Sequence, residues 1–233
     1  MADGLYVGMA GAAARAAQLE AVADNLANAE TPGFRAARPA FQSFMRGRTD
    51  KVSAAAVATG IDLRPGVTAP TDAALDVVPE GDLYLGVELL GGRRGYTRNG
   101  HIEVGPEGDL IIGGNRVISA AGAPLSVPPG ASPTLDEDGN VIVDGAVADT
   151  LGLFRVDGPL ERNGPALLTL GPGATAEAIE GTLRIGELEI GNVGSLESTV
   201  AMITAHRQFE TAMQAIETYR KMDERANEMG RVR

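Results

Sequence analysis

Small and apolar residues near the N-terminus recur at alternating spacings of four and three, which is the pattern of a helix with one apolar stripe. The positions on this stripe are Leu5, Met9, Ala12, Ala16, Leu19, Ala23 and Leu26. Because three of these seven residues are alanine, the stripe buries little area but permits the close approach of another helix. An isolated helix of this length is only marginally stable in water, so the pattern predicts a helix that needs a partner.

The last part of the chain repeats this pattern over a longer stretch. No proline or glycine occurs between Leu196 and about residue 229, and apolar residues again step by three and four. They are Met202, Ala205, Phe209, Ala212, Ile216 and Tyr219, with Ile203 and Met213 widening the stripe. Ser195 is suited to cap the start of this helix. We predict that the two end helices pair with each other.

Between the ends, the pattern changes to an alternation with period two, which is typical of strands. Residues 82–89 alternate, residues 101–112 hold two such runs around a Gly-Pro-Glu-Gly turn, and Asp138-Gly139 separates two more. An Asp-Gly pair in this position is a hairpin signal. We therefore expect a mainly antiparallel β domain over residues 75–191 and an extended connector over residues 46–74.

These patterns together predict an α+β fold, in which residues 1–45 and 192–233 pair as a coiled-coil-like helical domain. The 233 residues include 20 Lys and Arg against 31 Asp and Glu, for a formal net charge of −11. Nine of the basic and 21 of the acidic residues lie in residues 51–206, so self-association is easier through the near-neutral ends. The acidic balance argues against a nucleic-acid partner.

The sequence offers little support for catalysis or metal binding. It contains no cysteine and only two histidines, His101 and His206, which lack the spacing of a zinc site. The acidic run from Asp136 resembles the start of a calcium loop, but its twelfth position is Val147 where that loop needs glutamate. We expect no catalytic residue, no cofactor and no metal ion.

Targeting signals are also weak. No apolar run approaches the roughly 18 residues that a membrane-spanning helix needs. The first residues lack the basic region of a secretory signal. We therefore expect no direct membrane insertion and no cleaved signal peptide, so any export has to use another route.

The most informative segment lies at the end of the first predicted helix. Residues 22–35 include Asn25 and Asn28, followed by Pro32 and Gly33. The simplest interpretation is a helix stop, because proline cannot continue the helix and glycine supplies a turn. That interpretation leaves unexplained why two asparagines, which are poor helix formers, occupy the last turn.

Residues 25–34 read Asn-Leu-Ala-Asn-Ala-Glu-Thr-Pro-Gly-Phe. This segment resembles the Asn-Leu-Ala-Asn-x-x-Thr-x-Gly-Phe signature of bacterial flagellar axial proteins. Three further stretches agree in the family's order: residues 75–84 with the Leu-Asp-Val lead-in, residues 96–110 with the Thr-Arg-x-Gly hairpin, and residues 192–210 with the C-terminal Asn-Val, Met-Ile and Arg-x-Phe-Glu helix. One such match would be weak, but four in register identify the chain as similar to this family.

The chain departs from the family pattern at Gly191, at Gly194-Ser195 and at His206. These departures affect fine contacts rather than the resemblance itself. The length leaves little room for the large outer domain of hook proteins. The short connector, residues 62–66 and residues 225–227 are most similar to the proximal rod members. The distal rod members are the alternative.

The resemblance implies a structural subunit rather than an enzyme. Such a subunit is exported unfolded by the flagellar type III apparatus and polymerises in the basal body into the periplasm-spanning rod. The implied partners are further copies of the chain and other proximal and distal rod subunits. We expect the terminal helices to form the inner-tube assembly domain and the acidic β domain to face outward.

The expected assembly interface combines the two apolar stripes with the end of the first helix. Burial is expected from Leu5, Met9, Leu19 and Leu26 of the first stripe, and from Met202, Ile203, Phe209, Met213 and Ile216 of the second. Asn25 and Asn28 are expected to hydrogen-bond to the backbone near the helix end. Phe34 is expected to anchor the exit turn.

Two interpretations from other classes stay open at this point. One is a secreted β-rich enzyme that acts on the cell wall and carries its helices as a stalk. It is disfavoured by the lack of a convergent histidine, cysteine or carboxylate motif. The other is a binding module whose end helices close into a rigid intramolecular hairpin.

Overall fold

The computed structural model describes residues 2–45 and 52–231. The chain forms two compact units, between which it passes four times. The helical unit holds residues 1–27, 37–62 and 193–233, and the β unit holds residues 28–36 and 63–192.

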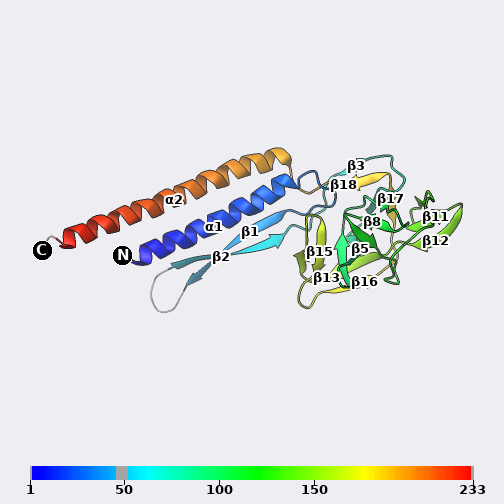
Figure 1. The fold of residues 1–233 in the computed structure, drawn as a ribbon, viewed down its shortest axis with the longest axis horizontal. Coiled ribbons are helices and arrows are strands. Elements are labelled where there is room, and N and C mark those ends of the chain that lie inside the picture. Colours follow the sequence, from blue (N-terminus) through cyan, green and yellow to red (C-terminus); the bar gives the residue numbers. More distant parts are fainter. Residues whose placement is uncertain (1, 46–51, 232–233) are drawn as a thin grey trace. The chain divides into compact units, whose positions relative to one another are not determined.

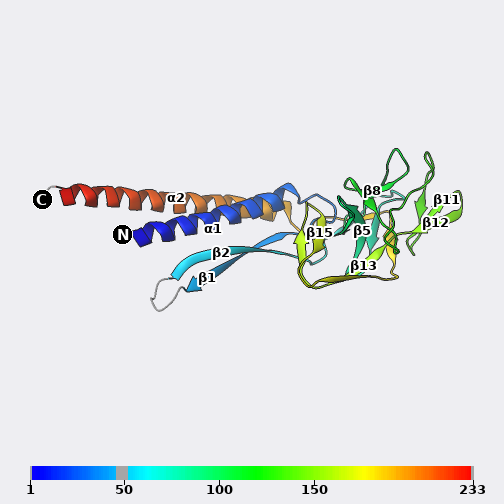
Figure 2. The ribbon, with the colours of Figure 1, turned by 60° about the horizontal axis from the view of Figure 1, so that its bottom comes forward.

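The helical unit is built on two helices from opposite ends of the chain. Helix α1 spans Ala2–Ala27 and helix α2 spans Ser195–Arg231. They lie side by side in both views (Figures 1 and 2), and the guanidinium group of Arg15 donates a hydrogen bond to Gln208 Oε1 at 2.9 Å. The predicted pairing of the end helices is confirmed.

Two long strands complete the helical unit beside α1 (Figure 2). Strand β1, Ala37–Met45, pairs antiparallel with β2, Val52–Ile61. Arg38 and Asp62 join the ends of this pair through an ion pair at 2.6 Å. The structure therefore has a paired strand within the stretch that we expected to be an extended connector. Sequence analysis missed the pair because β2 is rich in alanine, which has little strand propensity.

The β unit consists of short strands. Their bounds are Thr68–Pro70 (β3), Val77–Pro79 (β4), Leu83–Leu89 (β5), Arg93–Thr97 (β6), Glu103–Val104 (β7), Leu110–Ile112 (β8), Asn115–Val117 (β9), Thr134–Leu135 (β10), Asn140–Val143 (β11), Ala146–Thr150 (β12), Leu153–Asp157 (β13), Leu160–Arg162 (β14), Leu167–Leu170 (β15), Thr175–Ala178 (β16), Leu183–Ile185 (β17) and Glu187–Glu189 (β18). The many glycines and prolines of the sequence account for such short elements, since they favour turns.

A nine-stranded sheet dominates the β unit. Its main path runs β14-β15-β6-β5-β9-β8-β7, while β13 pairs with both β5 and β16. The β unit also contains a three-stranded sheet, β10-β11-β12, and two strand pairs, β17-β4 and β18-β3. The pairings among these described strands are antiparallel. The structure confirms the hairpins predicted over residues 101–112 and around Asp138-Gly139, as β7-β8 and β10-β11.

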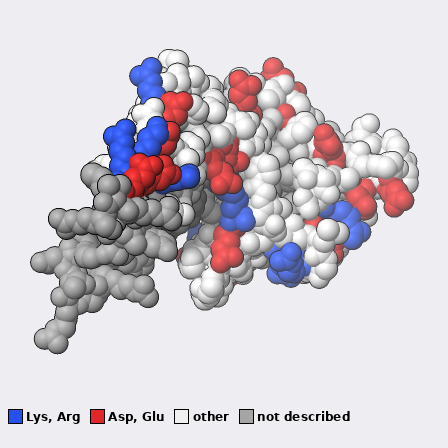
Figure 3. Space-filling model, turned by 60° about the vertical axis from the view of Figure 1, so that its left-hand side comes forward, with Lys and Arg blue, Asp and Glu red and all other residues white. Residues whose placement is uncertain are grey.

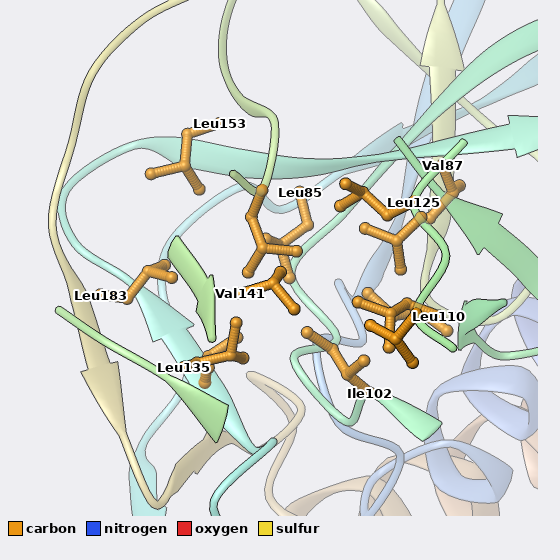
Figure 4. Close-up of a cluster of buried hydrophobic side chains, with 14 of the residues drawn as sticks. Leu85, Val87, Ile102, Leu110, Leu125, Leu135, Val141, Leu153 and Leu183 are labelled. Carbon is orange, nitrogen blue, oxygen red and sulfur yellow. The ribbon is translucent and has the colours of Figure 1, made fainter. Parts of the chain in front are cut away.

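The hydrophobic core of the β unit lies around β5, which is buried along almost its whole length. Leu85 and Val87 are both fully inaccessible to solvent and lie among aliphatic side chains from other strands and turns (Figure 4). Gly86 separates them because a Cβ there would lie 2.4 Å from the Phe154 ring. Branched aliphatic residues build this core, which fits the low aromatic content of the chain.

Replacing Leu85 with alanine is expected to lower the free energy of unfolding by about 2–5 kcal/mol, because the smaller side chain leaves a cavity in a packed core. Urea unfolding followed by tyrosine fluorescence measures this change. Leu90, in the turn directly after the same strand, is 94% exposed and is the matched control. Leu90→Ala should change stability by no more than about 0.5 kcal/mol. Equal losses in the two variants would contradict the assignment of the core to β5.

Candidate functional site

Both paired helices bury small residues within the helical unit. Ala12, Ala14 and Ala21 of α1 are buried, as is Ala205 of α2. A Cβ added at Gly8 would lie only 3.3 Å from the Ile216 side chain. The small residue Gly8 therefore lets the two backbones approach closely at this point, whereas of the three alanines on the predicted stripe Ala12 is buried, Ala23 is half-buried and Ala16 is exposed.

The structure divides the predicted interface residues of the helices into two groups. Leu19 and Leu26 of α1 are half-buried, and so are Met202, Phe209 and Ile216 of α2. In contrast, Met9, Ile203 and Met213 are 53%, 52% and 47% exposed. The side chain of Leu5 lies outside the described residues. The first group faces the interior of the helical unit, and the second faces solvent.

Helix α2 exposes further apolar side chains near its start. Leu196, Val200 and Ile203 are exposed and follow one another at spacings of four and three, so they share one face of the helix. Tyr219 and Met222 are exposed further along. A surface of this kind on a helix is typical of a protein interaction site.

Asn25 holds the start of β1 against the last turn of α1. Its Nδ2 donates to the carbonyl oxygen of Ala37 at 2.9 Å, and its Oδ1 accepts from the Ala37 amide at 2.7 Å. The side-chain carboxamide of Asn25 thus makes the two hydrogen bonds with the Ala37 backbone that a residue of a neighbouring strand would make. The expected backbone hydrogen bond of Asn25 is confirmed.

Asn28 begins the turn that leaves the helix. Its carbonyl oxygen accepts from the Thr31 amide at 3.0 Å, and its Oδ1 accepts from the Thr31 hydroxyl at 3.3 Å. Gly33 follows with φ +70°, and a Cβ there would lie 2.1 Å from the amide nitrogen of Asn99. Only glycine fits this position, because both its dihedral angle and its surroundings exclude a side chain.

Phe34 lies directly after this turn and is completely buried. The guanidinium carbon of Arg162 lies 4.8 Å from the centroid of its ring, within the range of a cation–π contact. The same guanidinium group donates to the carbonyl oxygen of Arg35. Phe34 and Arg162 therefore fix the course of the chain where it leaves α1.

A buried ion cluster, which sequence analysis missed, follows Phe34. Glu189 is only 1% exposed and lies between Arg35 and Arg98, which are also buried. Arg35 Nη1 donates to Glu189 Oε1, Arg98 Nε donates to Oε2 at 2.8 Å, and the Gly66 amide donates to Oε1 at 2.8 Å. We call these three charged side chains with the Gly66 amide the Glu189 cluster.

The cluster joins four segments of the β unit that are distant in the sequence. Arg35 follows the α1 exit turn, Arg98 follows β6, Gly66 precedes β3, and Glu189 ends β18. Arg98 also donates to the carbonyl oxygens of Gly81 and Leu83. The backbone of Glu189 contributes too, since its carbonyl oxygen accepts from the Gly33 amide at 2.7 Å.

Electrostatics favour the ionised form of Glu189. Burial raises the pKa of its carboxyl group, but the hydrogen bond from Arg35, the charge of Arg98 and the hydrogen bond from the Gly66 amide together outweigh burial. The net result is a pKa below its ordinary value.

Asn192, which ends the β unit, makes a second connection among these segments. Its Oδ1 accepts from the Ala36 amide at 2.7 Å, and its Nδ2 donates to the Arg64 carbonyl oxygen at 2.8 Å. Its own amide donates to the Phe34 carbonyl oxygen at 3.3 Å. Asn192 lies in the Asn-Val pair that the sequence resemblance included, so its motif was the available signal.

One face of the molecule shows charges of both signs (Figure 3). The face shown in Figure 3 carries acidic and basic side chains interspersed with uncharged ones. The part of the chain that the structure describes brings together no group of three or more side chains able to hold a metal ion. Neither described helix is long and apolar enough to cross a membrane.

Replacing Glu189 with glutamine is expected to destabilise the protein by about 3 kcal/mol or more at neutral pH, because two buried guanidinium groups lose their counter-charge. Denaturant unfolding measures the loss. Because the folded-state pKa is lowered, the stabilisation is complete above the ordinary value of 4.5 and is lost as the pH falls through the folded-state pKa.

The difference in the free energy of unfolding between wild type and Glu189→Gln should therefore shrink as the pH is lowered. Glu187→Gln, at a neighbouring and more exposed carboxylate, is the matched control and should show a much smaller effect. A pH-independent difference between wild type and Glu189→Gln would contradict the role of the Glu189 charge.

Comparison with known proteins places this geometry in a family. The family model "Flagella basal body rod protein" matches residues 5–35, which include most of α1 and its exit turn. The model "Flagellar basal body rod FlgEFG protein C-terminal" matches residues 185–229, which include Glu189, Asn192 and most of α2. The two models thus match both ends of the chain, together with the segments of the β unit that directly follow α1 and precede α2.

Full-length relatives agree with these matches. The chain is 35% identical over 251 residues to the flagellar basal-body rod protein FlgF of Salmonella typhimurium, and 34% identical to that of Escherichia coli, with 98% of each chain covered in both cases. It is 26% identical over 253 residues to the flagellar basal-body rod protein FlgG of Caulobacter vibrioides, with 94% of this chain and 95% of that protein covered. The chain belongs to the flagellar basal-body rod protein family.

Proposed function

We propose that this chain is a structural subunit of the flagellar rod, of the proximal type. The observation that carries the proposal is the end-to-end similarity to proteins named FlgF, at 35% and 34% identity. Similarity to proteins named FlgG also extends over most of the chain, but at 26–27% identity. The proximal (FlgF) type is therefore the better assignment, and the distal (FlgG) type is the weaker one.

In this proposal, residues 1–45 and 192–233 form the assembly domain and residues 75–191 form an outer β domain. The half-buried Leu19, Leu26, Met202, Phe209 and Ile216 hold the helical unit together in a coiled-coil-like packing. Leu5 and the exposed Met9, Ile203 and Met213 contact neighbouring subunits. Support comes from the exposure of Met9, Ile203 and Met213, which becomes favourable if polymerisation covers them.

Asn25, Asn28 and Phe34 act indirectly in this proposal. They set the direction in which the chain leaves α1, through the Ala37, Thr31 and Arg162 contacts. A correct exit direction is required if the helices of many subunits are to pack in one repeating arrangement.

We further propose that the subunit reaches the periplasmic rod of the basal body through the flagellar type III apparatus. The chain contains no cysteine, so no disulfide has to be opened before it is threaded unfolded. Its partners are then the export apparatus, other copies of itself and other rod subunits. Its role is structural, without catalysis or a cofactor.

The proposal predicts that Phe209→Asp prevents incorporation into basal bodies, because a carboxylate in the half-buried face of α2 separates the helices. Immunoblots of purified basal bodies and swimming assays measure this effect. Gln214→Asp, at an exposed position of the same helix, is the control and should assemble normally. Circular dichroism of the purified variant should still show the folded β unit. Normal rods and normal motility with Phe209→Asp would contradict the proposal.

A further inference from the structure

The sequence contains the tripeptide Arg-Asn-Gly twice, at residues 98–100 and 162–164, and no other asparagine of the chain precedes a glycine. An asparagine followed by glycine loses its side-chain amide most readily, because glycine has no Cβ to shield the backbone nitrogen that attacks the side chain. The two sites are equal in this local sequence, so a difference in their reactivity has to come from the fold.

The reaction needs no reactant other than water. The backbone nitrogen of the glycine gives up its proton and bonds to the asparagine Cγ, the Cγ–Nδ2 bond breaks, and ammonia leaves as a five-membered succinimide ring closes. Water then opens the ring at either of its two carbonyl groups, which gives aspartate or isoaspartate. Each event replaces a neutral carboxamide with a carboxylate, which is charged at neutral pH.

The fold holds Asn99 in place. Its Oδ1 accepts from the His101 amide at 3.0 Å, and its own amide donates to Thr97 Oγ1 at 3.0 Å. Gly100 is buried, its carbonyl oxygen accepts from the Val77 amide at 3.1 Å, and a Cβ added to it would lie 1.6 Å from the Val77 carbonyl oxygen. The rotations that ring closure requires are therefore blocked until this segment opens locally.

Asn163 is exposed and lies in the loop between β14 and β15. Its backbone amide donates to the Leu167 carbonyl oxygen at 2.9 Å, which closes the loop, but its carboxamide has no hydrogen-bond partner among the described residues. A Cβ added at Gly164 would have one neighbour within 4 Å, the Leu167 Cβ at 3.7 Å. Both the side chain and the attacking nitrogen thus have room to move.

We propose that Asn163 is a site of spontaneous deamidation in the folded protein, whereas the fold protects Asn99. The contrast rests on the surroundings of the two glycines and on the hydrogen bond that only the Asn99 carboxamide makes. The inference goes beyond the proposed function and does not depend on it, because it concerns the folded chain itself.

The modified residue lies directly after Arg162, which contacts the exit turn of α1. Arg162 Nη1 donates to the Pro165 carbonyl oxygen of the same loop at 3.1 Å, and its guanidinium carbon lies 4.8 Å from the centroid of the Phe34 ring. Deamidation therefore places a negative charge in the loop that carries this contact. The isoaspartate product also lengthens the main chain of the loop by one carbon atom.

Peptide mapping by mass spectrometry tests the inference, after incubation of the purified full-length chain in a mildly alkaline buffer. The peptide with Asn163 should gain one mass unit and contain isoaspartate. Its rate should be at least about tenfold higher than that of the peptide with Asn99, which reacts only after local opening.

Two controls separate the effect of the fold from that of the sequence. In concentrated urea the rates at Asn163 and Asn99 should differ by less than about threefold, because the unfolded chain exposes both Arg-Asn-Gly sequences. The matched variant is Asn163→Gln, in which the side chain would have to close a six-membered ring. Its peptide should keep its mass over the same period.

Equal rates at Asn163 and Asn99 in the folded protein would overturn the inference. So would an Asn163 that reacts in urea but stays intact in the folded chain. A preference for Asn163 that persists unchanged in urea would show that the local sequence separates the two sites, and would overturn the role of the fold. None of these results bears on assembly, so the rod assignment is tested separately by Phe209→Asp.

Discussion

A buried carboxylate between two guanidinium groups is the interaction on which the rest of this structure depends. Glu189 ends the last strand before α2, and Arg35 follows the turn that leaves α1, so their contact ties together the two segments that lead to the helices. Burying three charged groups costs free energy, and the hydrogen bonds made by Arg98, the Gly66 amide and two backbone carbonyl oxygens offset part of that cost, although Arg35 Nε has no hydrogen-bond partner among the described residues. Such a network tolerates few alternative arrangements, which favours one path for the chain ends.

The two units are stabilised in different ways. The β unit has an aliphatic core centred on β5 and is held together internally by its sheets and the Glu189 cluster. The helical unit is different, because its contacts involve many alanines and it leaves Met9, Leu196, Val200 and Ile203 exposed. Burial within one molecule is therefore incomplete, and contacts with other copies would add to it. This combination is what we expect of a subunit whose fold is fully stabilised only in an assembly.

The sequence was sufficient to predict the end helices and the hairpins, but not the contacts between segments that are distant in the sequence. Periodicity predicted both end helices and their pairing, and the turn signals predicted the β7-β8 and β10-β11 hairpins, because these features depend on neighbouring residues. The strand pair β1-β2 escaped prediction because its alanines give no strand signal. Glu189 escaped because it is one of 31 acidic residues, and only the tertiary fold brings Arg35 and Arg98 to it. The difference between Asn99 and Asn163 likewise depends on the packing of distant segments, since both residues stand in the same Arg-Asn-Gly sequence.

Hydrogen exchange at two amides tests the central claim most directly. The Gly33 amide donates to the Glu189 carbonyl oxygen and the Gly66 amide donates to the Glu189 carboxylate, while the Gly86 amide donates to Gly152 within the core. If the Glu189 cluster is part of the cooperative structure of the β unit, the amides of Gly33 and Gly66 should exchange with the same free energy of opening as that of Gly86. Rapid exchange at Gly33 and Gly66 beside a protected Gly86 would show that the segments leading to the helices open independently, and would contradict the account.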